Sequence, residues 1–305
     1  MQNSPKYLIV VVGPTAVGKT AIGIQLAKHF DTDVISCDSR QFYKELTVGT
    51  AKPTVQEMDG VIHHFINSHS IDQVVSAGDF EKECLSLLSE LYLKKDIYVL
   101  VGGSGLFVKA LLEGLDHFPE VPHSVRETLN ARFEKEGILP LQEELKERDP
   151  IYFEKVDIHN HQRIIRALEV CIGTGRPFSS YLSNSITKRP FTPIKVGLSL
   201  DRAVLFNRIN LRVDQMINNG LEAEVQGVSG YQDHYALRTV GYQELFDFFQ
   251  GKTSKEKAIE LIKRNTRRYA KRQLTWFKKD EETKWFAPSN FPEVLSYIKK
   301  SIHTK

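Results

Sequence analysis

Residues 10–27 read VVVGPTAVGKTAIGIQLA, and the motif GPTAVGKT at 13–20 within them decides the fold. The run YLIVVV at 7–12 is apolar and rich in β-branched residues, which is typical of a buried parallel strand. A helix is expected from about Lys19 to Phe30. A GxxxxGK motif that is followed by Ser or Thr, between a strand and a helix, is a phosphate-binding loop. The sequence therefore predicts that a phosphorylated ligand binds at this turn.

Each part of this loop has a task in phosphate binding. Its glycines let backbone N–H groups approach phosphate oxygens, and the helix N-terminus adds a favourable dipole. Lys19 supplies a positive charge, and the hydroxyl of Thr20 can bind Mg²⁺, which is the expected cofactor. The predicted phosphate-binding residues are Gly13, Pro14, Thr15, Ala16, Val17, Gly18, Lys19 and Thr20.

Strand and helix patterns alternate along the first third of the chain and predict an α/β fold with a parallel sheet flanked by helices. Between 116 and 189 no buried strand is evident, and the segments are helical, charged and interrupted by prolines. We therefore predict a core formed by residues 1–115 and 190–305, with a helical C-terminal part, and an all-helical insertion domain at 116–189. The expected strands are 7–12, 33–37, 96–101 and 194–200, and the expected helices include 80–93, 125–136, 139–148 and 161–172.

The composition is ordinary for a globular protein. The chain has 305 residues, of which 41% are hydrophobic, and its net charge of +3 is too small to indicate nucleic-acid binding by itself. Cys37, Cys84 and Cys171 are far apart and form no disulfide or zinc pattern, which favours a reducing compartment. No signal peptide or membrane-spanning run is evident. We expect a cytoplasmic enzyme without a membrane partner.

The acidic residues near the loop argue against a nucleotide-hydrolysing enzyme. Such an enzyme usually holds Mg²⁺ with an acid at the end of a second strand, but the strand expected at 96–101 is followed by Gly-Gly-Ser-Gly. Asp38, in SCDSRQFY, is the only acid at a strand end near the loop in sequence. A kinase or NTPase is therefore kept only as an alternative interpretation. An RNA-binding protein with a structural loop is a further alternative.

Eight segments in order along the chain help to identify the phosphorylated ligand. They are GPTAVGKT at Gly13, DSRQFY at Asp38, VGTAKP at Val48, SAGDF at Ser76, VGGSGLFVKALLEG at Val101, QRIIRALEV at Gln162, TVGYQEL at Thr239 and RRYAKRQLTWF at Arg267. Together they resemble the bacterial type of the tRNA dimethylallyltransferase family, also called tRNA isopentenyltransferase. This family transfers a dimethylallyl group from dimethylallyl diphosphate to the exocyclic amine of adenosine 37 of tRNA, beside the anticodon, and releases diphosphate.

The resemblance implies a P-loop NTPase-like core whose loop holds the diphosphate of the prenyl donor rather than ATP. The resemblance also implies that one side chain acts as a general base toward the exocyclic amine of the adenine. The exocyclic amine of adenine is a poor nucleophile, and a carboxylate that accepts its proton promotes the transfer. The resemblance assigns this role to Asp38, for which a turn residue or an outer Mg²⁺ partner is the alternative.

Departure of diphosphate develops negative charge, which needs cations and oriented donors. Lys19 is one such cation, and Arg212 shares a helix face with Arg208 by their i,i+4 spacing. The resemblance assigns a diphosphate contact to Arg212 and places Thr15 in the donor pocket. The alternative for Arg212 is an exposed ion pair with a nearby acid, either Asp214 or Glu222.

Basic residues of the C-terminal third predict a surface for RNA. Five of them recur at i, i+3, i+4, i+7 and i+8, which puts them on one helix face with an anion as the natural partner, although a solvated basic face is the ordinary alternative. These five are Arg264, Arg267, Arg268, Lys271 and Arg272. The resemblance adds further tRNA contacts, namely Asp38, Ser39, Arg40, Gln41, Ser104, Arg126, Gln162, Arg163, Ile164, Ile165, Arg166, Arg238, Thr239, Val240, Gly241, Tyr242 and Gln243.

The expected partners are thus dimethylallyl diphosphate and a tRNA anticodon stem-loop, with the insertion domain clasping the stem. A variant enzyme that prenylates free adenine nucleotides is disfavoured by the basic helix and the insertion. A monomer is expected. His63-His64 and His159-Asn160-His161 lack the second cluster that a zinc site needs, so structural or solvated roles are predicted for them.

Overall fold

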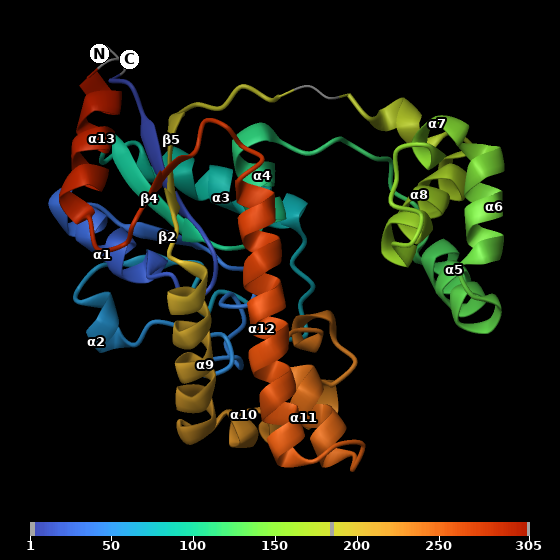
Figure 1. Cartoon of the computed structure of the whole chain (residues 1–305). Coiled ribbons are helices and arrows are strands. Elements are labelled where there is room, and N and C mark those ends of the chain that lie inside the picture. Colours follow the sequence, from blue (N-terminus) through green and yellow to red (C-terminus); the bar gives the residue numbers. More distant parts are fainter. Residues whose placement is uncertain (1–3, 184–185, 304–305) are drawn as a thin grey trace. The chain divides into compact units, whose positions relative to one another are not determined.

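The computed structural model describes residues 4–183 and 186–303. The chain divides into two compact units, one formed by the chain up to Leu112 and from Lys188 onward, the other by residues 113–187 (Figure 1). The smaller unit occupies the place of the predicted insertion, starting at 113 rather than 116 and ending at 187 rather than 189. It is a continuous segment, so the larger unit is assembled from both ends of the chain.

Within the described residues, the larger unit contains one sheet of six strands, in which every neighbouring pair is parallel. The strand order is β3-β2-β4-β1-β5-β6. Helices flank this sheet (Figure 1), which confirms the predicted α/β, P-loop NTPase-like core. The strands are β1 (Tyr7–Val12), β2 (Val34–Cys37), β3 (His63–His64), β4 (Ile97–Gly102), β5 (Thr192–Leu198) and β6 (Lys284–Phe286).

Helices of the larger unit fall into two groups. One group packs on the sheet, where Ile22 and Leu26 of α1 and Ile298 of α13 join Ile9 and Val11 of β1 in one buried cluster. The other group, α9 to α12, extends beyond the sheet edge (Figure 1), although Leu205 of α9 and Ala270 of α12 belong to the same buried cluster. The helices are α1 (Lys19–His29), α2 (Val55–Met58), α3 (Ala77–Leu91), α4 (Gly105–Glu113), α9 (Arg202–Asn218), α10 (Leu221–Gly227), α11 (Tyr242–Phe249), α12 (Lys255–Phe277) and α13 (Phe291–His303).

The segment after β2 is anchored to the helices α9 to α12. Tyr43 and Leu46 are fully buried in a second cluster with Val225 of α10, Leu245 of α11 and Ile262 of α12. Burial of several large apolar side chains is the main force that holds such a layer together. The residues that follow β2 are therefore held between the sheet and the long helix α12, not left as an exposed loop.

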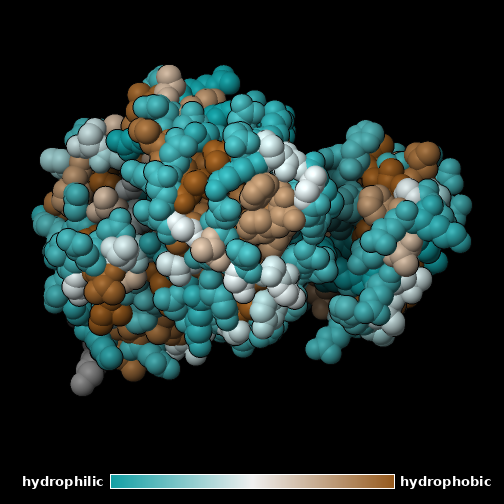
Figure 2. Space-filling model, turned by 90° about the horizontal axis from the view of Figure 1, so that it is seen from below, coloured by the Kyte–Doolittle hydropathy of each residue, from teal (hydrophilic) through white to brown (hydrophobic). Residues whose placement is uncertain are grey.

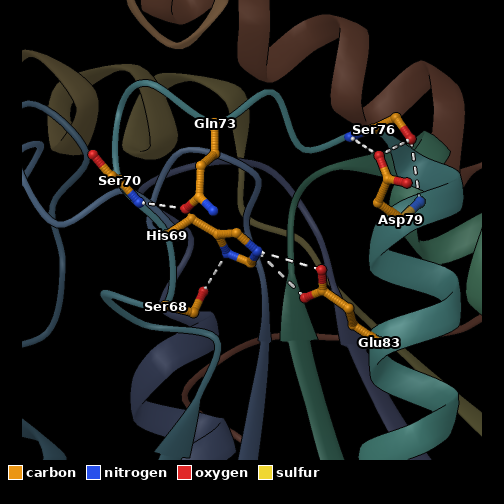
Figure 3. Close-up of polar contacts among 7 residues, drawn as sticks. All are labelled: Ser68, His69, Ser70, Gln73, Ser76, Asp79 and Glu83. Carbon is orange, nitrogen blue, oxygen red and sulfur yellow. Dashed lines mark hydrogen bonds and ion pairs between the residues drawn. The ribbon is translucent and has the colours of Figure 1, made fainter.

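The start of α3 is fixed by side-chain hydrogen bonds (Figure 3). Ser76 Oγ accepts a bond of 3.1 Å from Asp79 N, and Asp79 Oδ2 accepts one of 3.0 Å from Ser76 N, a reciprocal cap that stabilises a helix N-terminus. One turn along, Glu83 lies 3.4 Å from His69 Nε2, and His69 Nδ1 lies 2.8 Å from Ser68 Oγ (Figure 3). These contacts attach the segment before α3 to the helix.

The smaller unit is helical and has its own core. Leu129, Leu145, Ile164 and Leu168 are buried there with apolar neighbours from every helix of the unit. Asp149 is also fully buried, and its carboxylate accepts bonds from Ser179 N, Ser179 Oγ and Tyr152 N. The elements are α5 (His123–Glu136), α6 (Leu139–Arg148), α7 (Pro150–Phe153), α8 (His161–Thr174) and the 3₁₀ helix η1 (Phe178–Tyr181).

The face of the molecule that is seen from below is predominantly polar (Figure 2). Seen from below, hydrophilic residues cover most of the face, and hydrophobic residues form small separate groups (Figure 2). Scattered apolar residues of this kind are normal on a folded protein. Within the described part of the chain, no helix has the length and apolar character needed to cross a bilayer.

We expect Gly102→Ala to destabilise the protein by about 3 kcal/mol, because β2 and β4 leave no room for a side chain at this position. A Cβ atom there would lie 2.2 Å from the carbonyl oxygen of Cys37 and 2.7 Å from its Cβ. Urea denaturation would measure the loss. Gly230→Ala is the matched control, since nothing among the described residues lies within 4 Å of its Cβ position. Equal midpoints for the two variants would contradict the tight approach of the strands.

Candidate active site

The phosphate loop and Asp38 meet at the carboxyl edge of the sheet. The loop follows β1, Asp38 follows β2, and Gly103 with Ser104 follows β4, and these three strands are neighbours in the order β2-β4-β1. Ligands of open parallel sheets bind at this edge. Ser104 Oγ accepts a bond of 3.1 Å from Ser39 N, which joins the turn after β2 to the turn after β4.

The side chain of Lys19 folds back onto the phosphate loop. Its Nζ donates bonds of 2.9 Å to the carbonyl oxygens of both Gly13 and Pro14. Burial lowers the pKa of Lys19 to about 8, the charge of Asp38 acts to raise this pKa, and that of Arg212 acts to lower it. The three predicted catalytic charges are therefore close enough to influence one another.

Two arginines of α9 reach the phosphate loop, one turn apart on the helix. Arg212 Nη1 donates a bond of 3.3 Å to Thr15 Oγ1, and Arg208 Nη1 donates one of 3.3 Å to Val17 O. The acids considered as partners of Arg212 are engaged elsewhere, Asp214 with Lys263 and Glu222 with Lys255. Burial lowers the pKa of Arg212, and Asp38 acts against this effect. A half-buried guanidinium facing the loop is suited to bind an anion there.

Gln273 of α12 is a site residue to which the sequence analysis assigned no role. Its Oε1 accepts a bond of 2.8 Å from Thr15 N, and its Nε2 donates one of 2.9 Å to Gly103 O. The side chain is buried and spans the phosphate loop and the turn after β4. The amide of Thr15 is thereby occupied by protein, so it is not among the loop N–H groups that are free for phosphate.

A cavity of about 1040 Å³ opens beside the loop within the larger unit. Its walls come from the turn after β2, residues 49–51, the start of α4, the segment before α11, and one face of α12. The structure gathers many of the predicted site residues here: Thr15, Asp38, Ser39, Arg40, Ser104, Arg212, Arg238, Thr239, Val240, Gly241, Gln243 and Arg272.

The cavity walls are basic and aromatic. The guanidinium carbon of Arg40 lies 4.7 Å from the centre of the Tyr235 ring, and Arg40 Nη1 is buried without a hydrogen-bond partner among the described residues. Tyr269 also lines the cavity, and burial, followed by the charge of Asp38, raises its pKa. Aromatic rings beside cations are typical of sites that bind unstacked RNA bases.

Two residues predicted to contact tRNA have side chains that are engaged inside the protein. Tyr242 is fully buried, and its hydroxyl donates a bond of 2.6 Å to Glu224 Oε1. Gln41 Nε2 donates to the carbonyl oxygens of Thr50 and Ala51, and its Oε1 accepts from Ser36 Oγ. Direct RNA contact by the Tyr242 side chain is therefore corrected, because the ring is buried. Gln41 is half-buried, and its contact with RNA stays a prediction.

The five cations of α12 do not share one free surface. Arg264, Arg268, Lys271 and Arg272 are exposed, whereas Arg267 is half-buried. Arg267 turns toward α9, where its Nη1 donates a bond of 2.6 Å to Asn210 Oδ1, and Arg272 lines the cavity. The helical spacing correctly places the five on one broad side, but the packing of α9 and the cavity divides them.

In the smaller unit, the predicted RNA contacts on α8 and α5 fall into three groups. Gln162 and Arg163 are exposed. Arg126 and Arg166 lie 3.4 Å and 3.0 Å from the buried carboxylate of Glu169, which thus receives two cations. The third group, Ile164 and Ile165, is buried in the core of the unit. The prediction that these two side chains contact RNA directly is therefore wrong.

The histidine pairs have local partners. His64 Nε2 lies 2.9 Å from Asp33 Oδ2, and His63 Nδ1 lies 2.9 Å from Val61 O. His161 stacks on Phe133. Over residues 4–183 and 186–303, no group of three or more His, Cys, Asp or Glu side chains is arranged to hold a metal ion.

The fold and the site define a phosphate-loop α/β protein whose loop borders a cavity with basic and aromatic walls. A family model described as IPP transferase matches residues 41–280. Because this match spans more than half of the chain, the chain belongs to the IPP transferase family.

Relatives and solved structures agree with this family. A tRNA dimethylallyltransferase of Christiangramia forsetii is 50% identical over 299 residues, which is 98% of this chain and 99% of that protein. One from Flavobacterium johnsoniae is 49% identical over 304 residues, covering 97% and 98%. The crystal structure of the full-length tRNA isopentenylpyrophosphate transferase of Bacillus halodurans matches with a TM-score of 0.74 at 35% identity, covering 98% and 97%.

A third solved structure adds a more distant comparison. It is a eukaryotic dimethylallyltransferase acting on tRNA, with a TM-score of 0.74 at 28% identity, and the match covers 89% of this chain and 69% of that one. The resemblance predicted from the eight motifs is therefore confirmed at the level of the family.

Proposed function

We propose that this chain is a tRNA dimethylallyltransferase, which transfers a dimethylallyl group from dimethylallyl diphosphate to the exocyclic amine of adenosine 37 of tRNA. The observation that carries the proposal is that Asp38 and Arg212 line the cavity and that both of their charges act on Lys19 of the phosphate loop. A carboxylate suits the removal of a proton, and two half-buried cations suit a departing diphosphate. The curated relatives over nearly the whole chain bear the same name.

The reaction forms an N–C bond to the amine and breaks the C–O bond of the donor. In our proposal Asp38 accepts the proton that the amine loses, which strengthens the nucleophile. The charge that develops on the leaving diphosphate is stabilised by Lys19, Arg212 and free amides of the loop. Because all three side chains are largely withdrawn from water, these charges act more strongly than they would at the surface.

We further propose Mg²⁺ as the cofactor. The Thr20 hydroxyl is an oxygen donor, and such donors fit this hard cation. Thr20, at the start of α1, is the residue that would hold it. When bound, Mg²⁺ supplies neutralisation of the diphosphate charge. Removal by EDTA and restoration by added Mg²⁺ would test its need in donor binding as well as in transfer.

The tRNA partner fits the cavity and the exposed cations. In the proposal, the adenine enters the cavity between Arg40, Tyr235 and Tyr269, as a base must leave its stack before its amine can react. Arg264, Arg268 and Lys271 bind the RNA backbone, which gives affinity with a strong salt dependence. We keep the expectation of a monomer as part of the proposal, and light scattering would test it.

The deciding experiment combines purified protein, Mg²⁺, labelled dimethylallyl diphosphate and unmodified tRNA with adenosine at position 37. Free AMP and a tRNA without that adenosine are the control acceptors. Label in the first tRNA alone supports the proposal. Label in AMP would assign the free-nucleotide reaction instead, and Mg²⁺-dependent ATP turnover without transfer would assign an NTPase.

The affinity for dimethylallyl diphosphate should fall as the pH rises, because the pKa of Lys19 in the free protein is about 8. Only the protonated amine attracts the diphosphate, so from about pH 7 to about pH 9 we expect about a tenfold loss of affinity. Titration calorimetry without tRNA would measure it. In Lys19→Ala the affinity should be weak at both ends of this range and no longer change across it. If the affinity of this variant for dimethylallyl diphosphate still falls as the pH rises, the pH dependence belongs to another group.

A further inference from the structure

We propose that Glu224 is a positioning residue, which holds the turn at 47–51 and through it places Asp38 for proton transfer. Glu224 lies on the short helix α10, is half-buried and is not itself part of the cavity wall. The inference rests on the proposed function, since it concerns the base of that reaction. It adds a residue for which the motifs predicted no role.

The carboxylate of Glu224 binds three successive backbone N–H groups. Oε2 accepts bonds of 2.8 Å from Thr47 N and 2.7 Å from Val48 N, and Oε1 accepts one of 2.9 Å from Gly49 N. A row of amides that converge on one anion is a strong and directional arrangement. The negative charge therefore fixes the path of the backbone at this turn.

Glu224 and Tyr242 together form a clamp on the turn at 47–51. Its hydroxyl donates a bond of 2.6 Å to Glu224 Oε1, and burial, followed by the charge of Glu224, raises its pKa. A Cβ atom at Gly49 would lie 2.6 Å from the Tyr242 ring, so only glycine allows this approach. The turn is thus in contact with both the carboxylate of Glu224 and the fully buried ring of Tyr242.

The clamp is connected to Asp38 by a short chain of bonds. The turn is closed by a bond of 3.0 Å from Ala51 N to Val48 O. Gln41 Nε2 donates 3.2 Å and 3.3 Å bonds to the carbonyl oxygens of Thr50 and Ala51, and Gln41 N donates one of 3.0 Å to Asp38 O. A displaced turn therefore moves Gln41 and the backbone that carries Asp38.

Among the described residues, the phosphate loop makes no direct hydrogen bond to Glu224 or to the turn at 47–51. Its contacts run to α9 and α12 through Arg208, Arg212 and Gln273. Loss of the clamp should therefore disturb the base and the adenine side of the cavity while the donor site remains intact. This separation gives the proposal a readout that a general loss of stability would not produce.

The test compares Glu224→Gln with Glu222→Gln in steady-state transfer at saturating tRNA and dimethylallyl diphosphate, which gives kcat, and in binding of dimethylallyl diphosphate. In Glu224→Gln an amide N–H₂ replaces an oxygen that faced backbone donors. We expect kcat to fall about tenfold or more, because small displacements of reacting groups cost this much. Donor affinity should change less than about twofold. Glu222 lies on the same helix but pairs with Lys255, so its variant should match the wild type.

A second variant decides the matter if Glu224→Gln does not fold. Tyr242→Phe keeps the ring against Gly49 and removes one bond to Glu224, so kcat should fall about threefold with unchanged donor affinity. Equal kcat in Glu224→Gln and Glu222→Gln, or an unchanged kcat in Tyr242→Phe, overturns the positioning role. A parallel loss of donor binding also overturns it. If the wild-type protein itself transfers no label, the proposed function fails first, which distinguishes the two.

Discussion

Asp38→Asn should lower the single-turnover rate of transfer to tRNA by about a thousandfold, which is the scale of a lost general base. The change is nearly isosteric, and an asparagine Oδ1 can still accept the local bond that Asp38 Oδ1 accepts from Arg40 N at 3.1 Å. The turn after β2 should therefore keep its shape. What disappears is the group that takes the proton from the amine.

Binding of the prenyl donor should survive this substitution. Removal of the Asp38 charge takes one anion away from the site of another, whereas the pKa of Lys19, which Asp38 acts to raise, falls, so the two effects on donor affinity oppose each other. Calorimetric titration with dimethylallyl diphosphate would measure the affinity, and transfer of label would measure the rate. The expected signature is a large loss of rate without loss of donor affinity.

Asp157→Asn is a matched control for the local geometry. Asp157 Oδ1 accepts a bond of 3.1 Å from His159 N, the same two-residue spacing as at Asp38, but Asp157 lies on the surface of the smaller unit. This variant should transfer at the wild-type rate. An active Asp38→Asn enzyme would contradict the assignment of Asp38 as the general base. A loss of rate together with a loss of donor binding would indicate that Asp38 is a Mg²⁺ ligand instead.

The parts of the site that the sequence predicted are those fixed by local order. The phosphate loop needs a strand before it and a helix after it, and both are visible as hydrophobic patterns at β1 and α1. Asp38 follows an apolar run, so its place at a strand end could be predicted. The parallel sheet brings this strand end beside the loop. In contrast, β3 and β6 have two and three residues, too few to show a period.

Gln273 and Glu224 could not be predicted, because their partners are distant in the chain. Gln273 binds Thr15 and Gly103, and Glu224 binds residues 47–49, contacts that exist only once the helices pack on the sheet. From the sequence alone, a glutamine in a charged helix is expected to be exposed to solvent. For the same reason Tyr242 was expected at the RNA surface and lies in the core instead.

Arg212→Ala should lower turnover by about a hundredfold, because preorganised cations at a departing charge are among the largest contributions to catalysis. Arg212 is half-buried, has no carboxylate within ion-pair distance among the described residues, and contacts the loop at Thr15 Oγ1. Its charge is thus held in place before the donor binds. The affinity for tRNA should change less than about threefold, since this guanidinium faces the donor.

The comparison that makes this prediction decisive uses Arg202→Ala on the same helix. Arg202 stands at the first turn of α9, over the Phe206 ring, so its loss removes a cation of equal charge without touching the loop. It should leave both turnover and tRNA affinity unchanged. Lysine at 212 should restore activity only in part, because a lysine cannot offer the planar donors of a guanidinium. A variant at 212 that binds tRNA poorly but turns over normally would place Arg212 at the RNA instead, and the charge at the diphosphate would then rest on Lys19 alone.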